Sequence, residues 1–103
     1  MKFSDPYLRN VDKFDLLCRW IIFHSVLYYE LDKPIVSDEM FDNNCKQLVR
    51  GIKKDPESFE RSKYYHIMYD FDGSTGFDIP ARLDKKTRNK IMRDIKILEG
   101  SIK

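Results

Sequence analysis

Residues 28–42 read YYELDKPIVSDEMFD and mark the boundary between two predicted helices. Proline lacks a backbone N–H and fixes φ, so Pro34 cannot continue the helix that precedes it. Ser37 is a favourable N-cap residue, and Asp38 and Glu39 follow it, where carboxylates stabilise the positive end of a helix. The stretch therefore predicts a helix-turn-helix hairpin.

The two helices of this hairpin extend well beyond the quoted stretch. The first is predicted over Val11–Leu31, and its apolar residues lie so widely around the axis that it should be buried against more than one element. The second is predicted to begin after Ser37 and to end at Asp55-Pro56. Its core-facing residues follow the spacing of one helix face: Phe41, Cys45, Leu48 and Ile52.

The rest of the chain predicts shorter elements and one further long helix. A short helix should run from Pro56 to about Lys63. Residues 64–79 partly alternate as strands do, so a short β-hairpin is the alternative to helix there. Asp84 can cap a last, basic amphipathic helix over residues 84–102. The buried stripe of that helix is predicted to be Ile91, Ile95, Leu98 and Ile102. The fold class is mainly α, in a single small domain of residues 1–103.

The amino-acid composition favours a small folded protein with a single core. Of the 103 residues, 42% are hydrophobic and 35% charged, which suits one modest core with a strongly solvated surface. Cys18 and Cys45 fall in apolar helical patterns and the N-terminal sequence does not resemble a signal peptide, so we expect reduced, buried thiols and a cytoplasmic protein. The apolar run at residues 20–29 is too short to cross a bilayer, so no membrane partner is expected.

Five side chains should meet where the two hairpin helices are joined. Tyr28 and Tyr29 end the first helix, and the short link folds them towards the start of the second. Asp38 and Asp42 lie four residues apart and so share one face of the second helix, with Phe41 beside Asp42. The expected result is a small pocket with aromatic walls and two carboxylates.

These residues resemble a known family. The stretch LYYELDKPIVSDEMFD resembles the N-terminal helical module, often called domain Ia, of NAD-dependent DNA ligases. The residues that match the pattern of that module, without a gap, are Tyr28, Tyr29, Asp32, Pro34, Ser37, Asp38 and Asp42. The resemblance covers residues 16–56, under half of the chain, and Phe41 stands where the family usually has a tyrosine.

The resemblance implies a ligand, nicotinamide mononucleotide (NMN), which is one half of NAD. Tyr28 and Tyr29 would contact the nicotinamide half, and Asp38 and Asp42 would hold its polar groups. A pyridinium is a flat cation that favours aromatic faces and nearby carboxylates, so this assignment is chemically sensible. The ligase nucleophile lies in a Lys-x-Asp-Gly motif, whereas this chain has Asp70 in place of the lysine, in DFDG. We therefore expect no enzyme and no certain cofactor, with NMN or NAD as a candidate ligand.

The last helix carries a second candidate site. The segment from Arg82 to Lys103 has eight basic and three acidic residues, a net charge of +5, although the whole chain carries only +2. The side chains that could contact phosphates or an acidic protein are Lys85, Lys86, Arg88, Lys90 and Arg93. A solvated helix surface is the simpler interpretation of the same residues. His24 and His66 are too isolated in the sequence to predict a metal site.

Three functions are compatible with the sequence. The first is a small non-catalytic interaction protein built on a ligase Ia-like module, with the look of a phage-encoded accessory protein that binds or inhibits a host or viral protein in the host cytoplasm. The second is an NMN- or NAD-binding protein. The third is a nucleic-acid-binding protein that uses the basic last helix.

Overall fold

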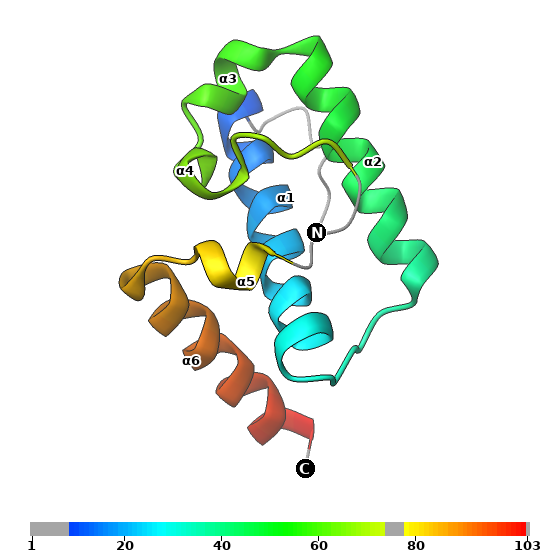
Figure 1. The fold of residues 1–103 in the computed structure, drawn as a ribbon, viewed down its shortest axis with the longest axis vertical. Helices are drawn as coiled ribbons and strands as arrows, with labels where there is room; N and C mark the ends of the chain where they lie inside the picture. The colour runs from blue at the N-terminus through cyan, green and yellow to red at the C-terminus, as the bar shows by residue number, and fades with distance from the viewer. Residues whose placement is uncertain (1–8, 74–77, 103) are drawn as a thin grey trace.

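The computed structural model describes residues 9–73 and 78–102, with side chains as far as residue 100. Every regular element in this part of the chain is helical (Figure 1). The elements are α1 (Asn10–Ser25), the π-helix η1 (Val26–Glu30), α2 (Asp38–Lys54), α3 (Pro56–Glu60), α4 (Tyr65–Met68), α5 (Ile79–Arg82) and α6 (Lys85–Ile102). The prediction of a mainly α fold is confirmed.

The core is built around α1. This helix contacts α2, α3 and α5, which lie around it in Figure 1. Cys18, Ile21 and Ile22 have no exposed surface, and Leu17 is also buried. Burying an isoleucine side chain contributes about 2 kcal/mol, so this helix supplies much of the hydrophobic stabilisation. Its wide apolar surface is buried against several elements, as the sequence predicts.

The first hairpin helix has nearly the predicted extent, but its last part is not α-helical. From Val26 to Glu30 the backbone is a π-helix, and the N–H of Leu31 donates to the carbonyl oxygen of Val26 at 3.0 Å. Asp32 then takes a positive φ of 53°, a conformation that only small polar residues and glycine adopt readily. The N–H of Lys33 donates to the carbonyl oxygen of Leu27 at 2.8 Å, which closes the helix end.

The second hairpin helix, α2, begins and ends as predicted. The side-chain oxygen of Ser37 accepts a hydrogen bond from the N–H of Met40 at 3.1 Å, which makes Ser37 the N-cap. Asp55 follows the last helical residue and caps α3 in turn, because its carboxylate accepts from the N–H of Ser58 at 3.2 Å. Gly51 lowers the intrinsic stability of α2, but a β-carbon there would lie 3.2 Å from the ring of Phe14, so glycine permits close approach to α1.

The alternative of a β-hairpin over residues 64–79 is wrong for the part of it that the structure describes. Two backbone N–H groups, of Ile67 and Met68, donate to the carbonyl oxygen of Tyr64, and the chain forms the short helix α4. Ile67 and Met68 are neighbours and both are buried, whereas a strand would place them on opposite faces. Residues 74–77 of the predicted hairpin lie outside the described residues.

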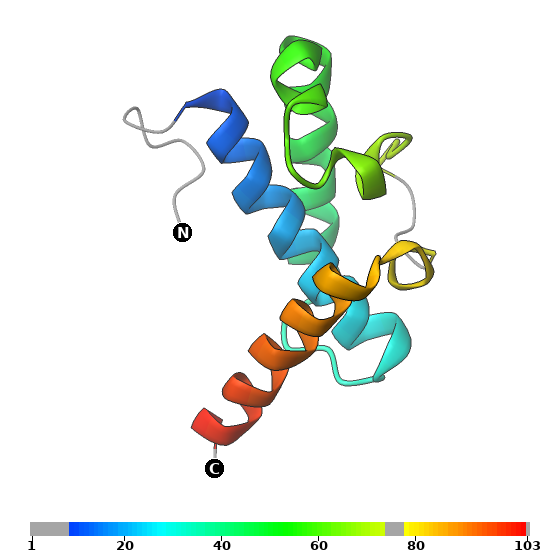
Figure 2. The same cartoon turned by 90° about the vertical axis from the view of Figure 1, so that its left-hand side faces the viewer.

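The predicted basic last helix is present as α6. Asp84 caps it, since its carboxylate accepts from the N–H of Thr87 at 3.1 Å. Ile91 and Ile95 are buried as expected and Leu98 is half-buried, while the side chain of Ile102 lies outside the described part. In Figure 2 the C-terminal half of α6 projects away from the other helices. Arg19 of α1 and Asp94 of α6 form an ion pair of 2.5 Å that joins the helix to the body.

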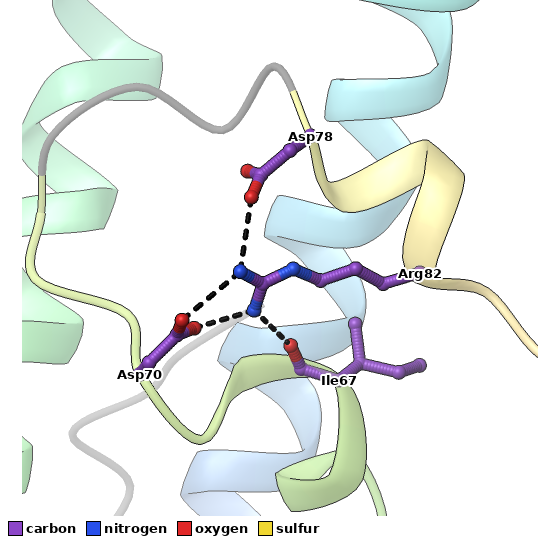
Figure 3. Close-up of polar contacts among 4 residues, drawn as sticks. All are labelled: Ile67, Asp70, Asp78 and Arg82. Atoms are coloured by element: carbon purple, nitrogen blue, oxygen red, sulfur yellow. Dashed lines mark hydrogen bonds and ion pairs between the residues drawn. The ribbon is translucent and has the colours of Figure 1, made fainter.

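Arg82 connects the two ends of the segment between α4 and α5 (Figure 3). Its guanidinium forms a two-point contact with the carboxylate of Asp70, one arm of which measures 3.0 Å, and it pairs with Asp78 at 3.0 Å. It also donates to the carbonyl oxygen of Ile67 at 3.2 Å. This arginine therefore holds α4, α5 and both flanks of the segment in one arrangement.

Replacing Arg82 with glutamine should destabilise the protein by about 1 kcal/mol at neutral pH, because ion pairs to the exposed carboxylates of Asp70 and Asp78 and a hydrogen bond to the Ile67 carbonyl oxygen are lost. Arg82→Lys should restore only part of this, since an ammonium cannot make the two-point contact with Asp70. The measurement is urea unfolding followed by circular dichroism.

The effect should depend on pH in a defined direction. Arg82 lowers the pKa of Asp70 below its usual value, so the stabilisation is fully present above that usual value and is lost as the pH falls through the lowered one. The difference between the wild type and Arg82→Gln should therefore shrink in acid. Equal unfolding midpoints for the two proteins at neutral pH would contradict this role of Arg82.

Candidate functional site

The end of the first hairpin helix and the start of the second together position the predicted site residues. The π-helical turn η1 presents Tyr28 and Tyr29 next to each other at the helix end. The cap at Ser37 fixes where α2 begins and hence where Asp38 and Phe41 lie. The short link between the two elements leaves these residues facing a common space.

That space is a pocket of about 330 Å³. Its lining residues are Tyr28, Tyr29, Asp38, Phe41, Asp42, Cys45 and Gly73. All five residues that the sequence analysis placed in a pocket therefore line a single one.

Three aromatic rings form the walls. The rings of Tyr28 and Phe41 are nearly parallel, with an interplanar angle of 23° and centroids 6.5 Å apart. The ring of Tyr29 meets that of Tyr28 at a steep angle, with a centroid separation of 4.7 Å. Tyr28 and Tyr29 are 37% and 39% exposed, so aromatic faces are accessible to a ligand from solvent.

The two carboxylates have different surroundings. Asp38 acts on Tyr28, because its negative charge and its hydrogen bond to the phenol both raise the pKa of Tyr28. Asp42 forms an ion pair with Lys46 at 2.9 Å, four residues along α2. Asp38 is therefore the carboxylate that is coupled to the aromatic wall.

Two lining residues, Cys45 and Gly73, were missed by the sequence reasoning. The sequence pattern places Cys45 only in the core-facing stripe of α2, although its position one turn after Phe41 also indicates the pocket. Its thiol is buried, which raises its pKa to about 12 and keeps it protonated at neutral pH. Gly73 comes from a segment distant in the sequence, and no pattern in the neighbouring residues predicts that it lines the pocket. It has a φ of 86°, and a β-carbon there would lie 2.9 Å from the side chain of Val49.

The basic residues predicted on the last helix do not form one uniform face. Lys85, Lys86, Lys90 and Arg93 are exposed on α6. Arg88 instead turns to the body of the protein, where its guanidinium pairs with Glu30 at 2.6 Å. The candidate phosphate-contacting surface is therefore smaller than predicted, because one of its five cations has a structural partner.

Each of the two histidines, His24 and His66, contacts other side chains of the protein. His24 is buried, with its ring centroid 4.2 Å from that of Trp20, and burial lowers its pKa to about 4. His66 contacts Asp84 at 2.9 Å, next to the start of α6. Within residues 9–73 and 78–102, no group of three or more histidine, cysteine or acidic residues is arranged to hold a metal ion.

The helices of the described part are not membrane spans, since each is too short or too polar to cross a bilayer. In comparisons with protein-family models, with curated proteins and with solved structures, the chain matched none.

The coupling between Asp38 and Tyr28 can be measured. Asp38→Asn should lower the pKa of the Tyr28 phenol, because it removes the negative charge that opposes ionisation. Asp42→Asn should change it less, since the Asp42 carboxylate is paired with Lys46. The measurement is a titration of the tyrosine ring resonances by NMR. An unchanged Tyr28 pKa in Asp38→Asn would show that the two groups do not interact in solution.

Proposed function

We propose that this chain is a non-catalytic binding protein whose pocket at the hairpin link takes the nicotinamide half of a nicotinamide nucleotide. The observation that carries the proposal is the convergence of Tyr28, Tyr29, Asp38, Phe41 and Asp42 on one pocket. For four of them, Tyr28, Tyr29, Asp38 and Asp42, the ligase Ia resemblance implies contact with NMN. Convergence alone would suit other flat cations as well, so the resemblance supplies the identity of the ligand.

The chemistry of the lining supports a flat cationic ring. A pyridinium is attracted to the electron-rich face of a tyrosine ring, and both tyrosines offer accessible faces. Asp38 adds a negative charge beside Tyr28, which favours a cation stacked on that ring. A volume of about 330 Å³ lies at the small end of ligand pockets, which suits the nicotinamide half better than the whole dinucleotide.

The sequence contains no Lys-x-Asp-Gly motif, which supports a non-catalytic role. The nearest match, DFDG, has Asp70 in place of the lysine and lies outside residues 16–56, and a carboxylate held by Arg82 cannot act as the amine nucleophile that the ligase reaction requires. The chain would then recognise the nucleotide without transferring any part of it.

Titration of NMN into isotope-labelled protein should produce saturable backbone amide shifts clustered at residues 28–45. Tyr28→Ala and Asp38→Asn should each weaken binding at least roughly tenfold, because each removes one of the contacts that recognise the cationic ring. Glu39→Gln is the matched control: it removes the same charge one residue along the first turn of α2, outside the pocket lining, and should bind as the wild type does.

Absence of shifts at millimolar NMN would refute the ligand. Equal losses in Asp38→Asn and Glu39→Gln would also count against the proposal, because they would indicate general electrostatic attraction instead of a site. The amide spectrum of each variant reports whether the fold is retained.

A second candidate function uses the same end of the molecule as a protein-docking surface. Ile35 and Met40, on the link and the first turn of α2, are 50% and 51% exposed, close in the chain to the exposed Tyr28 and Tyr29. Exposed apolar and aromatic residues around a rigid hairpin suit a partner protein. The partner would be a host or viral protein that a phage-type accessory protein binds or inhibits in the cytoplasm, a compartment that the free thiols of Cys18 and Cys45 also suit.

For this second function, Ile35→Asp combined with Met40→Asp should abolish capture of a specific partner from host extract while the fold is kept. Ile97→Asp, which changes an exposed apolar residue on α6, is the control and should leave capture unchanged. The measurement is a quantitative pull-down with tagged protein. A partner captured equally by all three proteins would place the docking surface elsewhere.

A further inference from the structure

A second pocket lies between α1 and α2, and no residue of it belongs to the pocket at the link. Its volume is about 720 Å³, within the range of small-molecule sites. The lining residues are Asn10, Lys13, Phe14, Leu17, Gln47, Arg50, Gly51, Lys54 and Asp55. Apart from Asp55, which follows α2, they come from the first half of α1 and the second half of α2, two helices that lie side by side (Figure 1).

The floor of this pocket is apolar and its shape depends on a glycine. Phe14 and Leu17 supply apolar surface from α1. Gly51 faces them from α2, and its missing side chain leaves the space that a β-carbon would take 3.2 Å from the Phe14 ring. At one end Asn10 donates to the carboxylate of Asp55 at 2.7 Å, so a hydrogen bond joins the start of α1 to the junction between α2 and α3.

The rim is basic. Lys13, Arg50 and Lys54 line the pocket, and none of them has a carboxylate within 4.0 Å among the described residues. Arg19 and Arg88, by contrast, are paired with carboxylates, of Asp94 and Glu30. Three cations gathered around one cavity without a protein counterion favour an anionic ligand.

The one carboxylate in the lining already has structural partners. Asp55 accepts from Asn10 and from the N–H of Ser58, where it caps α3. These bonds hold the pKa of Asp55 below its usual value, so its carboxylate stays ionised. Each of its two oxygens already accepts a hydrogen bond from the protein. The lining therefore retains a net positive charge. The side-chain amide of Gln47, which also lines the pocket, can form a directional hydrogen bond with a ligand.

We propose that this pocket binds a small amphipathic anion, a molecule that carries a phosphate and a flat apolar ring system, and that a nucleoside monophosphate with an uncharged base is the class that fits best; the cationic base of NMN does not suit this basic lining. The ring system contacts the floor formed by Phe14, Leu17 and Gly51. The phosphate lies among Lys13, Arg50 and Lys54, where charge-assisted hydrogen bonds hold it. The site is independent of the nicotinamide proposal, since it shares no residue with the pocket at the link.

The probes are adenosine monophosphate, adenosine and inorganic phosphate, titrated at low salt into isotope-labelled protein, because screening weakens exposed charge contacts. Adenosine monophosphate should give saturable amide shifts in residues 10–17 and 47–55, not at 28–42. Inorganic phosphate should bind the same residues more weakly, and adenosine should give no saturable shift at equal concentration. Adenosine binding as tightly as its monophosphate would overturn the role of the cations.

Charge variants complete the test. Arg50→Gln and Lys54→Gln should each weaken binding of adenosine monophosphate roughly tenfold, as expected for one lost charge-assisted contact. Lys53→Gln removes the same charge from an exposed neighbour that does not line the pocket, and it should bind as the wild type does. Equal weakening by Lys53→Gln and Lys54→Gln, or no saturable shift in the wild type, would overturn the proposal.

Discussion

The burial of α1 on several sides is the constraint on which the rest of the structure depends. A helix with apolar residues so widely spread must be covered by more than one element, and α2, α3 and α5 each contact it. Both pockets follow from this arrangement. The basic pocket forms beside the first half of α1, where α2 packs against it. The link pocket forms between η1, which follows α1, and the start of α2.

Much of the fold could be predicted because its signals are local. Ser37 and Asp55 cap helices through bonds within three residues, and Pro34 excludes continued helix whatever surrounds it. Five of the seven residues that line the link pocket were predicted for the same reason: helical spacing and one short turn suffice to bring them together. Such features depend on neighbours in the chain and are visible without a structure.

The features that sequence reasoning missed depend on contacts between distant segments. Gly73 reaches the link pocket from another part of the chain, and Arg88 pairs with Glu30, which lies on η1. The stretch before α5 alternates in its apolar residues as a strand does, yet burial of both Ile67 and Met68 favours helix. The basic pocket was missed because its cations are spread over two helices and form no motif in the sequence.

The π-helical turn η1 also has a consequence for changes in chain length. A π-turn spans five residues where an α-turn spans four, so it can take up one extra residue within a helix without disturbing what precedes it. The loss of one residue there would convert the π-turn into an α-turn, which leaves α1 and the chain after the turn in place but changes which side chains of the turn face outward. Chain length at this point therefore sets which side chains face the link pocket. A single-residue deletion or insertion in η1 would therefore change the lining of the link pocket while the fold is kept.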